Sequence, residues 1–168
     1  MTASASSVVS LIGRVLLSQI FLFSGVMKIV AWSTTAEQME AKGMVAVPFF
    51  LAAAICVEIG AGLLVLLGWK ARFAAVVLLL FLIPVTAIFH DFWKYEGTAR
   101  ENQLQHFAKN VTIMGGLSML AAAGAGALSL DARLARRHSN SQTSTAQDRS
   151  TLRPKFTEAR PVPSHERM

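Results

Sequence analysis

Four long apolar runs dominate this sequence. A helix needs about 20 predominantly apolar residues to cross the hydrocarbon core of a membrane. Four segments satisfy that requirement, at residues 8–31, 47–68, 71–90 and 107–130. Blocks of this length disfavour a soluble sheet protein, in which apolar and polar residues alternate along each strand. The runs therefore predict an all-α fold, a four-helix transmembrane bundle.

The composition agrees with a membrane protein. Of the 168 residues, 53% are apolar and 15% are charged, whereas charged residues make up about 25% of a soluble domain. The formal net charge of +6 comes from basic residues in loops beside the apolar runs and in the C-terminal tail. Because no fold signature or stacking aromatic pattern of a nucleic-acid module accompanies these charges, we expect no nucleic-acid partner.

The basic loops also predict the orientation in the membrane. Lys70, Arg72 and the cluster RLARR (133–137) lie on one side of a four-span protein, whereas the loops on the other side carry mixed charge. Cytoplasmic loops are enriched in Lys and Arg, so both termini are predicted to be cytoplasmic. Residues 139–168 are rich in Ser, Thr, Gln, Arg and Pro, which predicts a disordered basic cytoplasmic tail that can touch anionic lipid.

Glu58 interrupts the second run, LAAAICVEIGAGLLVLLG (51–68), near its middle. A carboxylate at that depth is costly unless it is paired or faces a polar interior. Arg14 and Lys28 share one face of the first run, and counting residues places Arg14 toward the cytoplasm and Lys28 toward the outside. We expect these two cations to bracket Glu58 in depth.

Further polar residues gather where the third run ends and the fourth begins. His90 and Asp91 end the third run, and HFAKN (106–110) opens the fourth with a polar face. Convergence of these groups predicts a polar interior that is open outward, with no residue assigned as catalytic. The candidate binding residues are Glu58, Lys109, Asn110, Arg14, Lys28 and His90.

Simpler interpretations of the same residues stay open. Arg14 and Lys28 can extend to the two membrane interfaces, as long basic side chains do. His90 and Asp91 can be ordinary loop residues, and Glu58 can be a buried staple with a single partner.

Several kinds of chemistry lack their motifs. The histidines and Asp91 do not have the short spacing of a metal site, so no metal is expected. The Walker loop, the Rossmann glycine fingerprint and the activated-serine motif are also missing. Cys56 is the single cysteine, so neither an intramolecular disulfide nor a CxxC redox motif can form.

The segments that carry the polar residues also carry a family resemblance. They are GRVLLSQIFLFSGVMKI (13–29), EIGAGLLVLLGWKAR (58–72), the histidine that ends the third run, and FAKNVTIMGGLSMLAAAGAGALSLD (107–131). In this order the chain resembles the DoxX family of small bacterial inner-membrane proteins over residues 11–131. The resemblance implies a four-helix domain at residues 8–131 in the bacterial cytoplasmic membrane, and it marks the six candidate residues without stating their roles.

Three functions remain open. Some DoxX relatives belong to quinone-linked oxidoreductases, so the resemblance implies a redox-accessory subunit. In that hypothesis Lys109, Asn110 or His90 bonds a quinone carbonyl, Glu58 handles a proton, and a redox partner subunit is needed. The second function is a small-solute or ion transporter, which would need a homo-oligomer. The third is a membrane scaffold without catalysis, and the sequence does not decide whether the protein is an enzyme.

Overall fold

The structure, a computed structural model, describes residues 3–137 and 139, and within them the secondary structure is helical without strands. The all-α prediction is confirmed. The helices are α1 (Ala3–Val30), α2 (Trp32–Ala41), α3 (Val47–Leu67), α4 (Ala71–Phe89), the short 3₁₀ helix η1 (Phe92–Lys94) and α5 (Gly97–Ala123).

The chain divides into two units, residues 1–133 and residues 134–168. In the second unit the described residues 134–137 and 139 are helical. Most of the predicted tail, residues 140–168, lies outside the described residues. The first unit contains every candidate residue.

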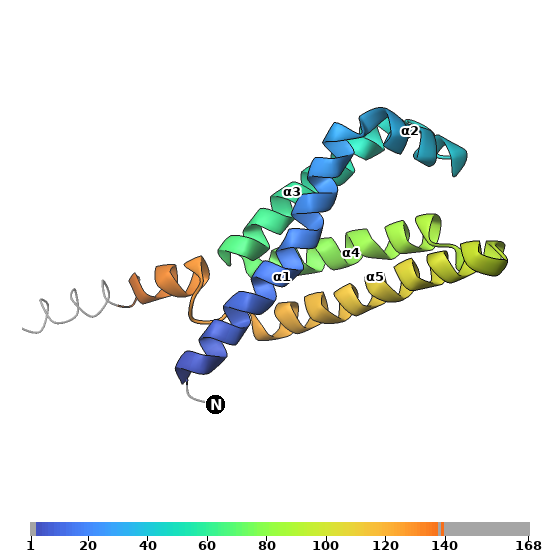
Figure 1. The fold of residues 1–168 in the computed structure, drawn as a ribbon. Helices are drawn as coiled ribbons and strands as arrows, with labels where there is room; N and C mark the ends of the chain where they lie inside the picture. The colour runs from blue at the N-terminus through green and yellow to red at the C-terminus, as the bar shows by residue number, and fades with distance from the viewer. Residues whose placement is uncertain (1–2, 138, 140–168) are drawn as a thin grey trace, which may run out of the picture. The chain divides into compact units, whose positions relative to one another are not determined.

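The first unit consists of two antiparallel helix pairs. Helix α1 runs beside α3, α4 runs beside α5, and α3 also packs on α4. Figure 1 shows the α1–α3 pair crossing the direction of the α4–α5 pair, with α2 extending from the far end of α1. A core of apolar side chains from all four long helices joins the pairs, and it includes Phe21, Val65, Leu78 and Leu117.

Glycines set the close approach of α1 and α3. A Cβ added at Gly25 would lie 2.7 Å from Cγ1 of Ile59, and one added at Gly62 would lie 3.1 Å from Cδ2 of Leu22. Small residues at such positions let membrane helices pack closely, since dispersion contacts replace the hydrophobic drive that water supplies elsewhere. These contacts fix the register of the two helices.

Backbone chemistry explains why α3 and α4 begin and end where they do. Pro48 sits in the first turn of α3, where its missing N–H leaves no bond unmade. At the other end Gly68 adopts φ 67°, and the N–H groups of Gly68 and Trp69 donate to the carbonyls of Val65 and Leu64. This Schellman turn stops α3 one residue before the predicted limit.

Helices α2 and α5 differ from the sequence-based predictions. Residues 32–41 fall between the first two predicted spans, in a segment predicted to be a loop. They form the helix α2 instead, and the side chain of Met39 in this helix is buried. The predicted limits 107–130 of the fourth run are wrong, because α5 begins ten residues earlier at Gly97 and ends at Ala123. Gly124 and Gly126 follow with φ of 82° and 76°, a conformation that ends a helix.

Three stretches of the described chain are long and apolar enough to cross a membrane. They are Ala5–Val30, Val47–Leu67 and Ala71–Lys94. A fourth span at α5, and the placement of both termini in the cytoplasm, stay predictions.

Candidate functional site

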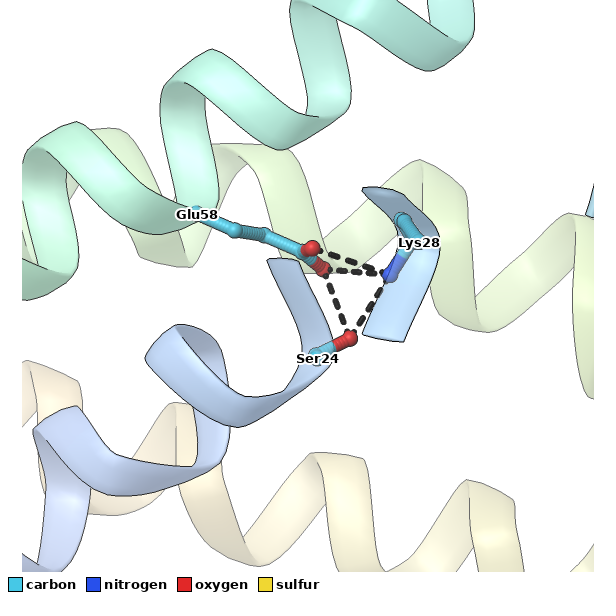
Figure 2. Close-up of polar contacts among 3 residues, drawn as sticks. All are labelled: Ser24, Lys28 and Glu58. Atoms are coloured by element: carbon cyan, nitrogen blue, oxygen red, sulfur yellow. Dashed lines mark hydrogen bonds and ion pairs between the residues drawn. The ribbon is translucent and has the colours of Figure 1, made fainter. Parts of the chain in front are cut away.

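Glu58 lies buried between α1 and α3, with 4% of its surface exposed. The ammonium Nζ of Lys28 donates to both carboxylate oxygens at 2.9 Å. The hydroxyl of Ser24 donates to Oε1 at 3.2 Å and accepts from Lys28 at 2.6 Å. Figure 2 shows these three side chains meeting in a triangle, which we call the Ser24–Lys28–Glu58 triad.

The register of α1 and α3 places this triad near the middle of α3, a helix long enough to span a membrane. Glu58 is the twelfth of the 21 residues of α3, and a helix of that length spans about 30 Å. Because Gly25 contacts Ile59 while Gly62 contacts Leu22, Lys28 lies level with the central turns of α3. Lys28 therefore contacts Glu58 directly and does not bracket it from a different level of α3, and its placement toward the outside stays a prediction.

Arg14 is buried as deeply as Glu58, with 2% of its surface exposed, but has different partners. Its guanidinium donates to the carbonyls of Leu66 at 3.2 Å and Val65 at 3.5 Å, and also to the carbonyl of Leu128. Nε is buried and has no acceptor among the described residues. Arg14 thus binds the last turn of α3 and does not bracket Glu58, because carbonyls left free at the helix end attract it.

Asn110 and Thr86 form a separate polar contact inside the α4–α5 pair. The amide of Asn110 donates to the hydroxyl of Thr86 at 3.0 Å, and that hydroxyl donates to the carbonyl of Leu82 at 2.6 Å. Both residues are buried. The predicted approach of Asn110 to Glu58 is not among its contacts.

His90 and Lys109 belong to a fourth group, which joins the end of α4 to the first half of α5. Nδ1 of His90 lies 3.0 Å from Oε1 of Gln103, and the rings of His90 and His106 stack with centroids 5.1 Å apart. Lys109 Nζ lies 3.4 Å from Nδ1 of His106. Within the described residues no three His, Cys, Asp or Glu side chains gather as metal ligands would.

A charged contact also connects the loop that follows α2 with the residues that follow α4. Lys42 Nζ lies 2.6 Å from Oδ1 of Asp91, and Lys94 Nζ lies 3.1 Å from Oδ2. The hydrogen bond to Asp91 raises the pKa of Lys42 above its ordinary value, against a smaller opposing effect of burial. This contact joins α2 to the end of α4.

Comparison with known proteins identifies the family. The DoxX family model matches residues 9–91. The inner membrane protein YphA of Escherichia coli (strain K12) is 32% identical over 130 residues, which cover 77% of this chain and 93% of that protein. The chain belongs to the DoxX family.

Two further relatives extend this finding. The inner membrane protein YqjF of Escherichia coli (strain K12) is 36% identical over 121 residues, covering 72% of this DoxX chain and 88% of that protein. The ER-derived vesicles protein ERV29 of Saccharomyces cerevisiae is 35% identical over 65 residues, covering 39% of this chain and 21% of that protein. No solved structure matches. This DoxX protein is a multi-pass protein of the bacterial inner membrane.

Sequence reasoning missed several partners of the candidate residues. Ser24 lies four residues before Lys28, a spacing that places both on one helix face, so its role in the triad had a local signal. Thr86 and Gln103 had none, because their partners lie 24 and 13 residues away along the chain.

Proposed function

We propose that this DoxX protein is a redox-accessory subunit that binds a quinone head group at the Ser24–Lys28–Glu58 triad. The observation that carries the proposal is the ion pair at the middle of the α1–α3 interface. Its two members differ in access, since 25% of the Lys28 side chain is exposed and 5% of the Glu58 side chain. A lipid-phase ligand can therefore reach Lys28 while Glu58 stays covered.

The three side chains suit a quinone in chemical terms. Lys28 and Ser24 carry N–H and O–H donors that a quinone carbonyl would take over from their present acceptors, the Glu58 carboxylate and the Ser24 hydroxyl. Glu58 is positioned to exchange a proton with the same group through them, which quinone reduction requires. The electrons would come from a partner subunit, because the sequence has no motif for a bound haem or flavin.

The donors in this proposal differ from Lys109, Asn110 and His90, which were predicted from the sequence. Asn110 lies inside the α4–α5 pair, where it is bonded to Thr86, and His90 and Lys109 lie in the group between the end of α4 and the first half of α5. Lys28 and Ser24, which contact Glu58 directly, replace them in the proposal.

A second function is favoured by a different observation. Lys28 has three donors, and its contacts with Ser24 and both Glu58 oxygens engage it fully without a ligand. A satisfied buried ion pair can fix the register of two helices. That role suits a membrane assembly protein without catalysis.

Native mass spectrometry of gently purified protein, with organic extraction of bound quinone, separates the two functions. Wild type is compared with Glu58→Gln, Lys28→Met and the control Lys42→Met, whose ion pair with Asp91 lies beyond the ends of α2 and α4. Quinone that is near-stoichiometric in wild type and in the control, and lost in the two triad variants, supports the redox-accessory function. Equal quinone in all four proteins, or none in wild type with a discrete partner or oligomer retained, contradicts it and favours assembly.

A further inference from the structure

The turn between α3 and α4 borders a pocket of about 650 Å³ at the opposite end of α3 from Val47. The side chains of Lys70, Arg72 and Phe73 line one part of it, and residues 123–126 and Ser129 line another. The missing side chain of Gly124 leaves room for Arg72 at the edge of this space. A Cβ at Gly124 would lie 3.0 Å from Nε of Arg72.

The two cations of this pocket lack acidic partners. Among the described residues neither Lys70 nor Arg72 takes part in an ion pair. Arg72 donates at 3.5 Å to the carbonyl of Ala123, and Nζ of Lys70 lies 5.8 Å from the centroid of the Trp69 ring. Both cations therefore retain donors for an anion.

Asp131 lines the same pocket, but its carboxylate is already engaged. Oδ1 accepts from the backbone N–H of Lys70 at 2.8 Å, and Oδ2 accepts from the N–H of Ala71 at 3.2 Å. Asp131 thus caps the first turn of α4. Two cations and one carboxylate leave the pocket with a net charge of one positive unit, which matches one phosphodiester.

The position of the pocket indicates which kind of anion it would bind. Two apolar stretches able to span the membrane, Val47–Leu67 and Ala71–Lys94, end and begin at this turn, so the pocket lies at the membrane surface. Trp69 and Phe73 expose 44% and 65% of their surfaces there. Aromatic side chains at this level are typical of the interface between acyl chains and head groups.

We propose that this pocket binds the phosphate of an anionic phospholipid, with Lys70 and Arg72 on the phosphate and Phe73 beside the acyl chain. Basic pockets between membrane helices bind acidic lipid head groups in this way. The site is separate from the triad, because Arg14 and the last two turns of α3 lie between them.

Lipid titration of the delipidated full-length protein in detergent, followed by native mass spectrometry, tests the proposal. The probes are dioleoyl phosphatidylglycerol, dioleoyl phosphatidylcholine and glycerol 3-phosphate. The variants are Lys70→Gln/Arg72→Gln and Arg72→Gln alone. The control is Arg100→Gln, whose guanidinium lies over the Phe92 ring, away from this pocket.

We expect phosphatidylglycerol to bind wild type and the control equally, and to bind the double variant about tenfold more weakly. Phosphatidylcholine should bind all proteins alike, and glycerol 3-phosphate should not displace the lipid. Equal phosphatidylglycerol binding by wild type and the double variant would overturn the proposal. Displacement by glycerol 3-phosphate would overturn the lipid as the source of the phosphate.

Circular dichroism checks that each variant keeps its helices. If the double variant loses helicity, Arg72→Gln decides the question, because Arg72 is exposed and its bond to Ala123 is long. A severalfold loss of phosphatidylglycerol binding in that variant supports the site, and unchanged binding overturns it.

Discussion

Two positions along the α1–α3 interface satisfy a cation of α1 in opposite ways. Near the middle of α3, Lys28 is paired with the charge of Glu58. At the turn between α3 and α4 Arg14 is bound by the carbonyls of Val65, Leu66 and Leu128. The two cations are 14 residues apart, which is about four helical turns, so they lie on similar faces of α1.

The two contacts differ in whether both partners can be replaced by substitution. An ion pair consists of two side chains, and both can be replaced together by apolar residues. Backbone carbonyls cannot be removed by substitution, so nothing compensates for the loss of Arg14. The triad is therefore a position that can vary as a unit to suit a ligand, whereas Arg14 is tied to the backbone.

The largest expected effect comes from Arg14. Replacement by Met leaves the carbonyls of Leu66 and Leu128 without their charged donor, and should lower the free energy of unfolding by about 4 kcal/mol. Thermal unfolding in detergent measures this loss. Arg14→Lys, which keeps the charge but has a single donor nitrogen, should recover only part of it; full recovery would mean that charge alone matters at this end.

Breaking the triad should have the next largest effect. Glu58→Leu leaves the half-buried Lys28 without its counter-charge, which should cost about 3 kcal/mol, the low end of the range for breaking a buried pair. The double variant Lys28→Met/Glu58→Leu should recover most of this stability, and a double-mutant cycle in thermal unfolding measures the coupling. A double variant less stable than either single variant would remove the contrast with Arg14.

A neutral contact sharpens the comparison. Asn110→Ala removes the bond to Thr86 within the α4–α5 pair, and should lower the free energy of unfolding by about 1 kcal/mol, as hydrogen bonds between membrane helices typically do. Thr86→Val serves as the reciprocal variant in the same unfolding assay. A loss as large as that from Glu58→Leu would show that charge adds little to a buried contact here.

The smallest effect is expected at the Lys42–Asp91 contact. Lys42→Met breaks one of the two ion pairs of Asp91 and should cost about 1 kcal/mol near pH 8, because Lys94 still neutralises the carboxylate. Because folding raises the pKa of Lys42 above 10.5, its contribution is full below that pH and disappears as the pH rises through the raised value. Unfolding temperatures of wild type and variant should therefore converge as the pH rises through the raised pKa of Lys42; a constant difference would contradict the pair.

Local chemistry made the central helices predictable. Helices α3 and α4 begin and end within one residue of the predicted limits, because Pro48, Gly68 and the apolar runs act locally. Helix α2 was missed because it is short and polar. The predicted limits of α5 were wrong because hydropathy does not detect the polar first turns of this helix. It also extends the predicted helix over the apolar residues 124–130, which lie beyond the end of α5.

The candidate site was predictable only where spacing along one helix decides contacts. Glu58 required a cation, and Lys28 lay on the right face of α1 to supply one. The depth of Lys28 and the partners of Arg14 depend on the register of α1 against α3, which Gly25 and Gly62 set through packing. Carbonyl acceptors have no signature in a sequence, since every residue carries one.

The bond between Arg14 and Leu128 has a consequence for how the protein is made. The two residues are 114 positions apart, so α1 is synthesised and enters the membrane long before its last acceptor exists. Until residue 128 emerges, the guanidinium has only the carbonyls of Val65 and Leu66 as its acceptors in the folded interface. The final packing of α1 therefore requires the segment that follows α5. In a chain truncated before residue 128, Arg14 should lack one of its acceptors and α1 should be held less firmly.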